Sequence, residues 1–205
     1  MSNYFYNYVK FVLAVSIFVI IAFMPAVVSV NLNFADASTD SNLVSDSIVS
    51  SDYGWVWPIQ NYKQISSYYG RRSSPTLHAS SFHLGIDIPA LEGTPLIACD
   101  DGQVIFASWG AGGGYTITLQ LSNYDNIKVS YCHTSPIMYV KYGESVKKGR
   151  VIGCVGPKNV YGINNNPYKD LNGNPTNGAT TGCHLHFAVK VNNKNVNPLD
   201  YYNLN

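Results

Sequence analysis

Apolar and polar residues alternate over short stretches of this chain, and this alternation restricts its fold more than any other feature. The clearest case is YTITLQL at residues 115–121, and IKVSY at 127–131 repeats it after a turn. Side chains along a β-strand point alternately to the two faces of a sheet, so both stretches predict strands that are buried on one face. Residues 95–107 and 151–155 are short β-rich runs bounded by glycine, and no window shows a helical period of useful length. We predict an all-β fold of antiparallel sheets with many short strands.

The first 37 residues have the pattern of an export signal. Lys10 precedes an uncharged apolar run over residues 11–30, and Ala-Asp-Ala at 35–37 follows as a small-x-small cleavage site. We predict a signal peptide at residues 1–37, cleaved after Ala37. The run is also long enough to span a bilayer, so an uncleaved anchor that attaches the chain through residues 11–30 is the alternative. Both interpretations place the remaining residues outside the cytoplasm, secreted or held in the cell envelope.

The remaining chain contains one linker and one domain. Residues 38–54 are rich in Ser and Asp, as in a short linker, and residues 55–205 have a pattern of strands and turns that predicts one domain. The formal net charge is +1 and the Lys and Arg residues are scattered, so the chain has no electrostatic signature of a nucleic-acid partner. We expect a monomer.

Four cysteines, Cys99, Cys132, Cys154 and Cys183, lie in the part of the chain that we expect to be exported. Such a compartment permits two disulfides, but their pairing cannot be derived from the sequence. A domain of this length does not need cross-links, so buried free thiols are an equal alternative.

Two stretches interrupt the strand pattern. Residues 110–114 predict a tight glycine-rich turn, and residues 157–181 form a long segment rich in Asn, Gly and Pro. A loop of that length in a compact domain is usually functional or mobile. Because it leads directly into His184, we predict that it forms one wall of a site; a surface insertion without structure is the alternative.

The last apolar run carries two histidines in the segment GCHLHFAV at residues 182–189. In a strand, His184 and His186 share one face, while Cys183, Leu185 and Phe187 point to the other, into the core. Two imidazoles on one face can reach a single small site. One can bind a metal while the other acts on a substrate or supports a ligand.

A second cluster lies about a hundred residues earlier, where His83 and Asp87 flank Gly85 in HLGID. We interpret this segment as a loop entering a strand, with Gly85 allowing both side chains to converge. Imidazole and carboxylate are ordinary zinc ligands, and three protein ligands with a water make an open, catalytic coordination shell. His133 ends a predicted strand, and a neutral histidine near such a water can accept or return a proton.

With these residues the chain resembles the lysostaphin-type zinc endopeptidases, which cut peptidoglycan cross-links in bacterial walls. The resemblance covers about residues 55–202 and rests on an ordered series of segments: YGR at 69–71, FHLGIDI at 82–88, GTP at 93–95, DGQV at 101–104, GGY at 113–115, YCH at 131–133, GESVKKG at 143–149, VIG at 151–153 and GCHLHF at 182–187. It implies the fold of that family, one Zn²⁺ per chain bound by His83, Asp87 and His186, and His133 and His184 as the catalytic histidines.

The resemblance also implies a function. The chain would be a zinc metalloendopeptidase that hydrolyses stem-peptide or cross-bridge links of peptidoglycan through a zinc-activated water. The alternative is a non-catalytic wall-binding or envelope-assembly protein that reuses the fold, because a fold does not fix a function.

Several further residues are candidates for roles near the site. Tyr68, Tyr69 and His78 are candidates for a tyrosine or histidine beside the metal. Arg71 and Arg72 either hold a peptide carboxylate or form a solvated turn. Cys132 and Cys183 precede His133 and His184, and strand alternation predicts that both thiols turn away from those neighbouring histidines; the sequences are YCH at 131–133 and CHLH at 183–186.

Overall fold

A computed structural model of the chain describes residues 53–74 and 79–202. The signal peptide or anchor predicted for residues 1–37, nearly all of the linker and the candidate His78 lie outside the described residues. Within those two described ranges, no helix has the length and apolar character needed to cross a bilayer.

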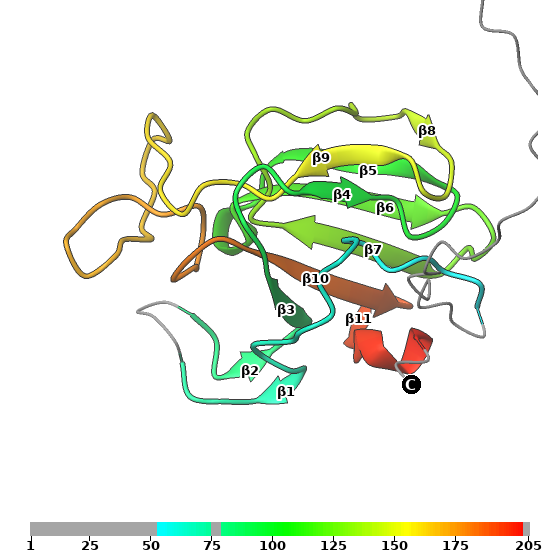
Figure 1. The fold of residues 1–205 in the computed structure, drawn as a ribbon, viewed down its shortest axis with the longest axis horizontal. Coiled ribbons are helices and arrows are strands. Elements are labelled where there is room, and N and C mark those ends of the chain that lie inside the picture. Colours follow the sequence, from blue (N-terminus) through cyan, green and yellow to red (C-terminus); the bar gives the residue numbers. More distant parts are fainter. Residues whose placement is uncertain (1–52, 75–78, 203–205) are drawn as a thin grey trace, which may run out of the picture. The chain divides into compact units, whose positions relative to one another are not determined.

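The main sheet of the described fold has seven strands (Figure 1). The hydrogen-bonded order is β11-β10-β7-β6-β5-β8, and β3 also pairs with β10. Every pairing is antiparallel, which confirms the predicted architecture. The strands are β3 (Ile86–Pro89), β5 (Gly102–Trp109), β6 (Tyr115–Leu121), β7 (Ile127–Cys132), β8 (Ser145–Val146), β10 (His184–Val191) and β11 (Lys194–Val196).

Two smaller sheets and two short helices complete the described elements. β1 (Gly70–Arg71) pairs with β2 (Phe82–His83), and β4 (Pro95–Ile97) pairs with β9 (Val151–Cys154). The helices are single 3-10 turns, η1 (Ala111–Gly113) and η2 (Pro198–Tyr201). The expectation that the chain has no long helix is confirmed for residues 53–74 and 79–202.

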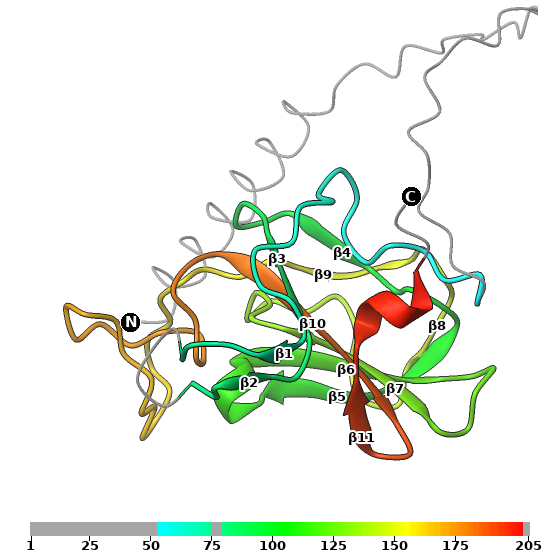
Figure 2. The ribbon, with the colours of Figure 1, turned by 90° about the horizontal axis from the view of Figure 1, so that it is seen from below.

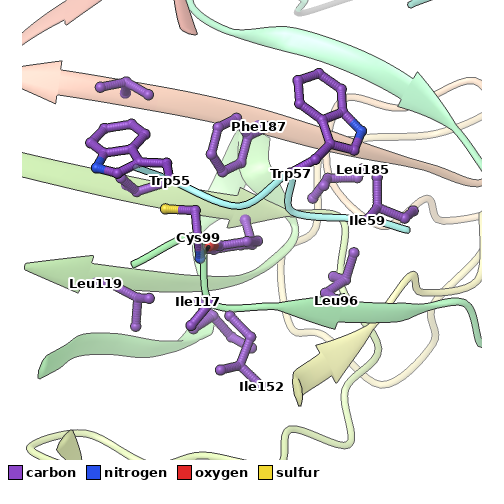
Figure 3. Packing of buried hydrophobic residues seen from close by; sticks show 14 of the residues in the cluster. Trp55, Trp57, Ile59, Leu96, Cys99, Ile117, Leu119, Ile152, Leu185 and Phe187 are labelled. Carbon is purple, nitrogen blue, oxygen red and sulfur yellow. Dashed lines mark hydrogen bonds between the residues drawn. The ribbon is translucent and has the colours of Figure 1, made fainter. Parts of the chain in front are cut away.

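The core covers one face of the main sheet and follows from the alternation in the sequence. In β6 and β10 the apolar positions Ile117, Leu119, Leu185 and Phe187 are completely buried. They pack against the β4–β9 sheet and against the segment that precedes β4 and carries Trp55, Trp57 and Ile59, as Figure 3 shows. Burying a side chain of this size stabilises the fold by about 1.5–3 kcal/mol. The polar residues between them are thereby placed on the opposite face of the sheet.

The site lies at one end of the main sheet, where β7 ends beside the start of β10. β7 ends at Cys132 and β10 begins at His184, and the long loop at residues 157–181 leads into β10 (yellow to orange in Figures 1 and 2). The glycine turn lies beside them: the amide of Gly110 donates to Gly114 O over 2.7 Å, and that of His133 donates to Gly113 O over 2.7 Å. The predicted tight turn is therefore confirmed.

All four cysteines are free in the structure. Of the two alternatives left by the sequence, the structure thus has free thiols and no bridges. Cys99 and Cys132 are buried, and Cys154 and Cys183 are partly buried.

Candidate metal centre

Strand β10 places His184 and His186 on the face of the sheet that is opposite the core. Leu185 and Phe187, which alternate with them, are fully buried, whereas the side chains of the two histidines remain 13% and 17% exposed. In the β3–β10 pair, Asp87 lies directly across from His186. Residues directly opposite in an antiparallel pair share a face, so pairing of the strands brings the carboxylate to the imidazole.

His83 reaches the same place from the end of β2, and Gly85 makes that approach feasible. A Cβ atom at Gly85 would lie 2.4 Å from the carbonyl oxygen of Phe187 and 2.9 Å from the ring of His186. Any side chain there would displace either β10 or the imidazole. Only glycine therefore permits this close passage of the chain between His83 and Asp87.

Three donor atoms converge within hydrogen-bonding distance of one another. His83 Nε2 lies 3.1 Å from Asp87 Oδ1 and 2.9 Å from His186 Nδ1, and His186 Nδ1 lies 2.8 Å from Asp87 Oδ1. Tetrahedral ligands at 2.0–2.1 Å from zinc are separated by about 3.3 Å, so a small expansion of this triangle accommodates the ion. Two imidazoles and one carboxylate are also a donor set that zinc prefers, and three ligands leave one coordination position open. These residues, which we call the ligand cluster, fit a catalytic zinc ion.

The second oxygen of Asp87 is held by Arg72. Arg72 Nη1 donates to Asp87 Oδ2 over 3.0 Å and also to the hydroxyl of Ser67, which in turn lies 3.2 Å from His83 Nδ1. The Tyr68 carbonyl accepts from His83 Nδ1 over 2.9 Å, which leaves Nε2 unprotonated toward the cluster. Arg72 and Ser67 thus link both upstream members of the ligand cluster.

The electrostatics of the ligand cluster keep its members ready to bind a cation. Burial by itself raises the pKa of Asp87, but the close imidazoles of His184, His186 and His83 outweigh burial and hold that pKa below its usual range. Burial lowers the pKa of His186, against the opposing effect of the Asp87 carboxylate. An ionised carboxylate and a neutral imidazole are the forms that coordinate metal.

His133 and His184, the histidine pair, lie beside the cluster with ring centroids 4.7 Å apart. His133 Nδ1 lies 2.7 Å from the carbonyl of Asn177, and His184 Nδ1 lies 2.9 Å from that of Gly182. A carbonyl only accepts, so each Nδ1 carries the proton and each Nε2 is left with a lone pair. Burial, and next the proximity of His184, lower the pKa of His133 well below its ordinary value. His133 therefore stays neutral at neutral pH.

A cleft of about 880 Å³ contains both groups of residues. The end of the long loop forms one of its walls through Ala179, Thr180 and Thr181, which confirms the role predicted for that loop. Asn177 holds this wall in place through two hydrogen bonds. Its side chain accepts from the amide of Tyr115 over 2.9 Å and donates to the carbonyl of Thr134 over 3.0 Å.

Comparison with known families identifies the fold and its relatives. Residues 81–198, more than half of the chain, match the model of peptidase family M23. The chain belongs to peptidase family M23. Solved structures agree: a zinc-containing peptidase from Vibrio cholerae has a TM-score of 0.53 at 25% identity, over 72% of this chain and 39% of that one. The catalytic domain of lysostaphin from Staphylococcus simulans also has a TM-score of 0.53, at 29% identity over 68% of this chain and 90% of that one. The resemblance and the fold expected from the sequence are confirmed.

Curated relatives of this M23 domain have more than one role. The DD-carboxypeptidase/endopeptidase Mpg of Neisseria meningitidis is 33% identical over 138 residues, which are 67% of this chain and 27% of Mpg. The murein hydrolase activator NlpD of Salmonella dublin is 26% identical over 165 residues, which are 80% of this chain and 36% of NlpD. The chain thus spans about a quarter to a third of the length of these relatives.

The structure of this M23 domain contradicts one prediction about its cysteines. Cys132 lies directly opposite His186 in the β7–β10 pair and lines the same cleft as His133, so the prediction that its thiol turns away from His133 is wrong. The reason is that β7 ends at Cys132, and His133 follows with a left-handed backbone (φ 58°) that returns its side chain to the same face. Burial raises the pKa of the Cys132 thiol to about 11, so the thiol is protonated at neutral pH in the metal-free protein.

The other candidates of the sequence analysis lie near the cleft in different ways. Arg72 is occupied by Asp87, while Arg71 is exposed. Tyr68 contributes its carbonyl and is 63% exposed as a residue, and the hydroxyl of Tyr69 donates to the carbonyl of Asn195 over 3.0 Å. Ser67 and Asn177 were not predicted from the sequence, where the only signal was the Asn177-Gly178 pair, which indicated a turn.

Proposed function

We propose that this M23 domain is a zinc-dependent endopeptidase that hydrolyses peptide cross-links of bacterial peptidoglycan. In this proposal His83, Asp87 and His186 bind one Zn²⁺ per chain, and His133 and His184 are the catalytic histidines. The observation that carries it is the juxtaposition of the ligand cluster with two imidazoles whose Nδ1 atoms are both bound to carbonyls. Mpg, whose name describes an endopeptidase, supports the reaction type, and the peptidoglycan DD-endopeptidase ShyC of Vibrio cholerae, 31% identical over 139 residues, supports the substrate class.

The residues of the cleft have different roles in the proposed reaction. A bound zinc ion would supply Lewis acidity to the scissile carbonyl and to the attacking water, whose pKa it would bring to about 7. Nε2 of one member of the histidine pair would accept a proton from the attacking water. Nε2 of the other, once it has received that proton, would donate a hydrogen bond to the oxyanion or pass the proton to the leaving amine. The carbonyls of Asn177 and Gly182 keep both rings in the orientation that this exchange requires.

Location and assembly follow from the same proposal. A substrate in the cell wall requires export, which residues 1–37 would direct, either as a cleaved signal peptide or through an anchor at residues 11–30. Peptidoglycan stem peptides or cross-bridges are then the partners, and the domain acts as a monomer.

The similarity to NlpD favours a second candidate function, that of a hydrolase activator without activity of its own. The decisive experiment incubates the full chain with purified cell walls, alone, with a chelator, and with zinc restored after the chelator. We expect hydrolysis that the chelator abolishes and zinc restores, and a His186→Ala variant without bound zinc or activity. A zinc-loaded protein that releases no fragments alone, yet stimulates a separate wall hydrolase, would establish the activator instead.

A further inference from the structure

The face of β10 that carries the histidines continues beyond the ligand cluster to a lysine. His184, His186, Ala188 and Lys190 alternate with buried residues of the core, so all four side chains belong to the cleft face. Four residues of an antiparallel strand span about 13 Å, which is the distance along β10 from His186 to Lys190. Lys190 is exposed and lines the same cleft as the ligand cluster.

A second lysine lies directly opposite the first. Lys128 of β7 is the register partner of Lys190, so the two ammonium groups project from the same face of the sheet. Like charges directly opposite each other on a sheet destabilise it. Among the ion pairs of residues 53–74 and 79–202, none involves either lysine, and the Lys128 ammonium contacts only the side-chain oxygen of Asn193, at 2.9 Å. The fold therefore keeps an uncompensated positive pair here, which we call the lysine pair.

Of the lysine pair only Lys190 lines the cleft, and the other charges of the lining do not neutralise it. Asp87 is the only acidic residue that lines the cleft in the described part of the chain, and Arg72 already compensates its charge. The excess charge of the cleft is thus positive before any metal binds, and a divalent ion adds to it. A cleft of one sign attracts ligands of the opposite sign and orients them.

We infer that Lys190 and Lys128 bind a free carboxylate of the peptide substrate, about 13 Å from the scissile bond. This inference rests on the proposed function, because it takes the ligand cluster as the point of cleavage. An extended peptide advances about 3.3 Å per residue, so the carboxylate belongs to a group roughly four residues from the cleaved bond. The substrate class is accordingly an acidic peptide, and a substrate with an amide at that position fits less well.

The test compares two soluble probes that differ only in charge. They are cross-linked peptidoglycan dimers with free carboxylates, and the same dimers after conversion of those carboxylates to carboxamides. For the zinc-loaded full chain, we expect kcat/KM to be about tenfold higher for the carboxylate dimer, mainly through a lower KM. The Lys128→Gln/Lys190→Gln variant should lose this preference. Added salt should reduce the preference of the unaltered protein.

A matched control comes from the neighbouring strand. Lys194 of β11 is exposed but lies opposite Val191, which packs on the core side, so Lys194→Gln removes one lysine charge away from the cleft face and should retain the preference. Unchanged zinc content in all variants, and a melting temperature no lower than that of the unaltered protein, exclude misfolding. The inference is overturned if the unaltered protein has no preference, or if the double variant keeps it.

Failure of the proposed function gives a different result. If the zinc-loaded protein cleaves neither dimer, the endopeptidase proposal fails, and calorimetric titration with the same two dimers then tests the lysine pair alone. Tighter binding of the carboxylate dimer by about tenfold, lost in the double variant, would support the pair as a carboxylate site. Equal binding of the two dimers would overturn it.

Discussion

The ligand cluster and the histidine pair lie in one cleft but are held in place in different ways. In the ligand cluster, side chains hold side chains: Asp87 contacts both imidazoles through Oδ1 and Arg72 through Oδ2. In the histidine pair, each ring is oriented by a backbone carbonyl, from Asn177 or Gly182. Interactions between charged and polar side chains thus hold the proposed metal site together. At the proposed proton-transfer site, contacts with backbone carbonyls fix the orientation and the tautomer of each ring. The two groups should respond to different substitutions.

The largest effects should come from removing one member of each group. Asp87→Ala should abolish zinc binding and reduce activity by about 10³-fold or more, because the ion contributes several kcal/mol to the transition state. His133→Ala should retain zinc and reduce kcat by about 10²–10⁴-fold, as expected for a lost acid–base group. Zinc content and turnover are measured on the same samples. Loss of zinc from His133→Ala would contradict the division between the two groups.

The next effect concerns the partner of Asp87. Arg72→Met should weaken zinc binding by about 10–100-fold, as loss of an outer partner of a metal ligand does. Competition with a chromophoric chelator measures the affinity. Arg71→Met is the matched control, since Arg71 is the exposed neighbour, and it should bind zinc normally. An Arg72→Met protein with unchanged affinity would show that the ion pair does not support the ligand cluster.

The sequence predicted the local part of this site well. A period of two residues in the chain assigns His184 and His186 to one face and Leu185 and Phe187 to the other, and the structure has that division. The same rule failed at Cys132. It assumes a continuous strand, and the left-handed backbone of His133 breaks the period at that position.

The long-range part could not be derived from spacing. Asp87 and His186 are 99 positions apart, and their contact depends on which strand pairs with β10. Similarly, the contact of Arg72 with Asp87 and that of His133 with Asn177 depend on how loops fold over the sheet. Only the resemblance to a known family indicated that the two histidine clusters converge.

A smaller effect should follow from loosening the loop that holds the histidine pair. Asn177→Ala leaves the amide of Tyr115 and the carbonyl of Thr134 without their partner, and each buried unpaired group costs about 1–3 kcal/mol. We expect a lower free energy of unfolding and a lower kcat at unchanged zinc affinity. Denaturant melts and zinc titration provide the measurements. Asn172→Ala, an exposed change in the same loop, should leave all three values unaltered; a fall in zinc affinity with Asn177→Ala would instead show that the two groups are coupled.

The smallest effect is a pH dependence of stability that distinguishes the two groups in protein treated with excess chelator. The pKa of His133 is lowered in the fold, so between that value and about 6.5 the unfolded chain binds more protons than the folded one. The free energy of unfolding then rises with pH, and on account of this residue it should fall by on the order of 1 kcal/mol on going from pH 7.5 to 5.5. His133→Gln should remove that part of the loss, whereas the part due to His186, whose pKa is also lowered, should remain. Parallel pH profiles for the two proteins would mean that the imidazole of His133 is not kept neutral by burial.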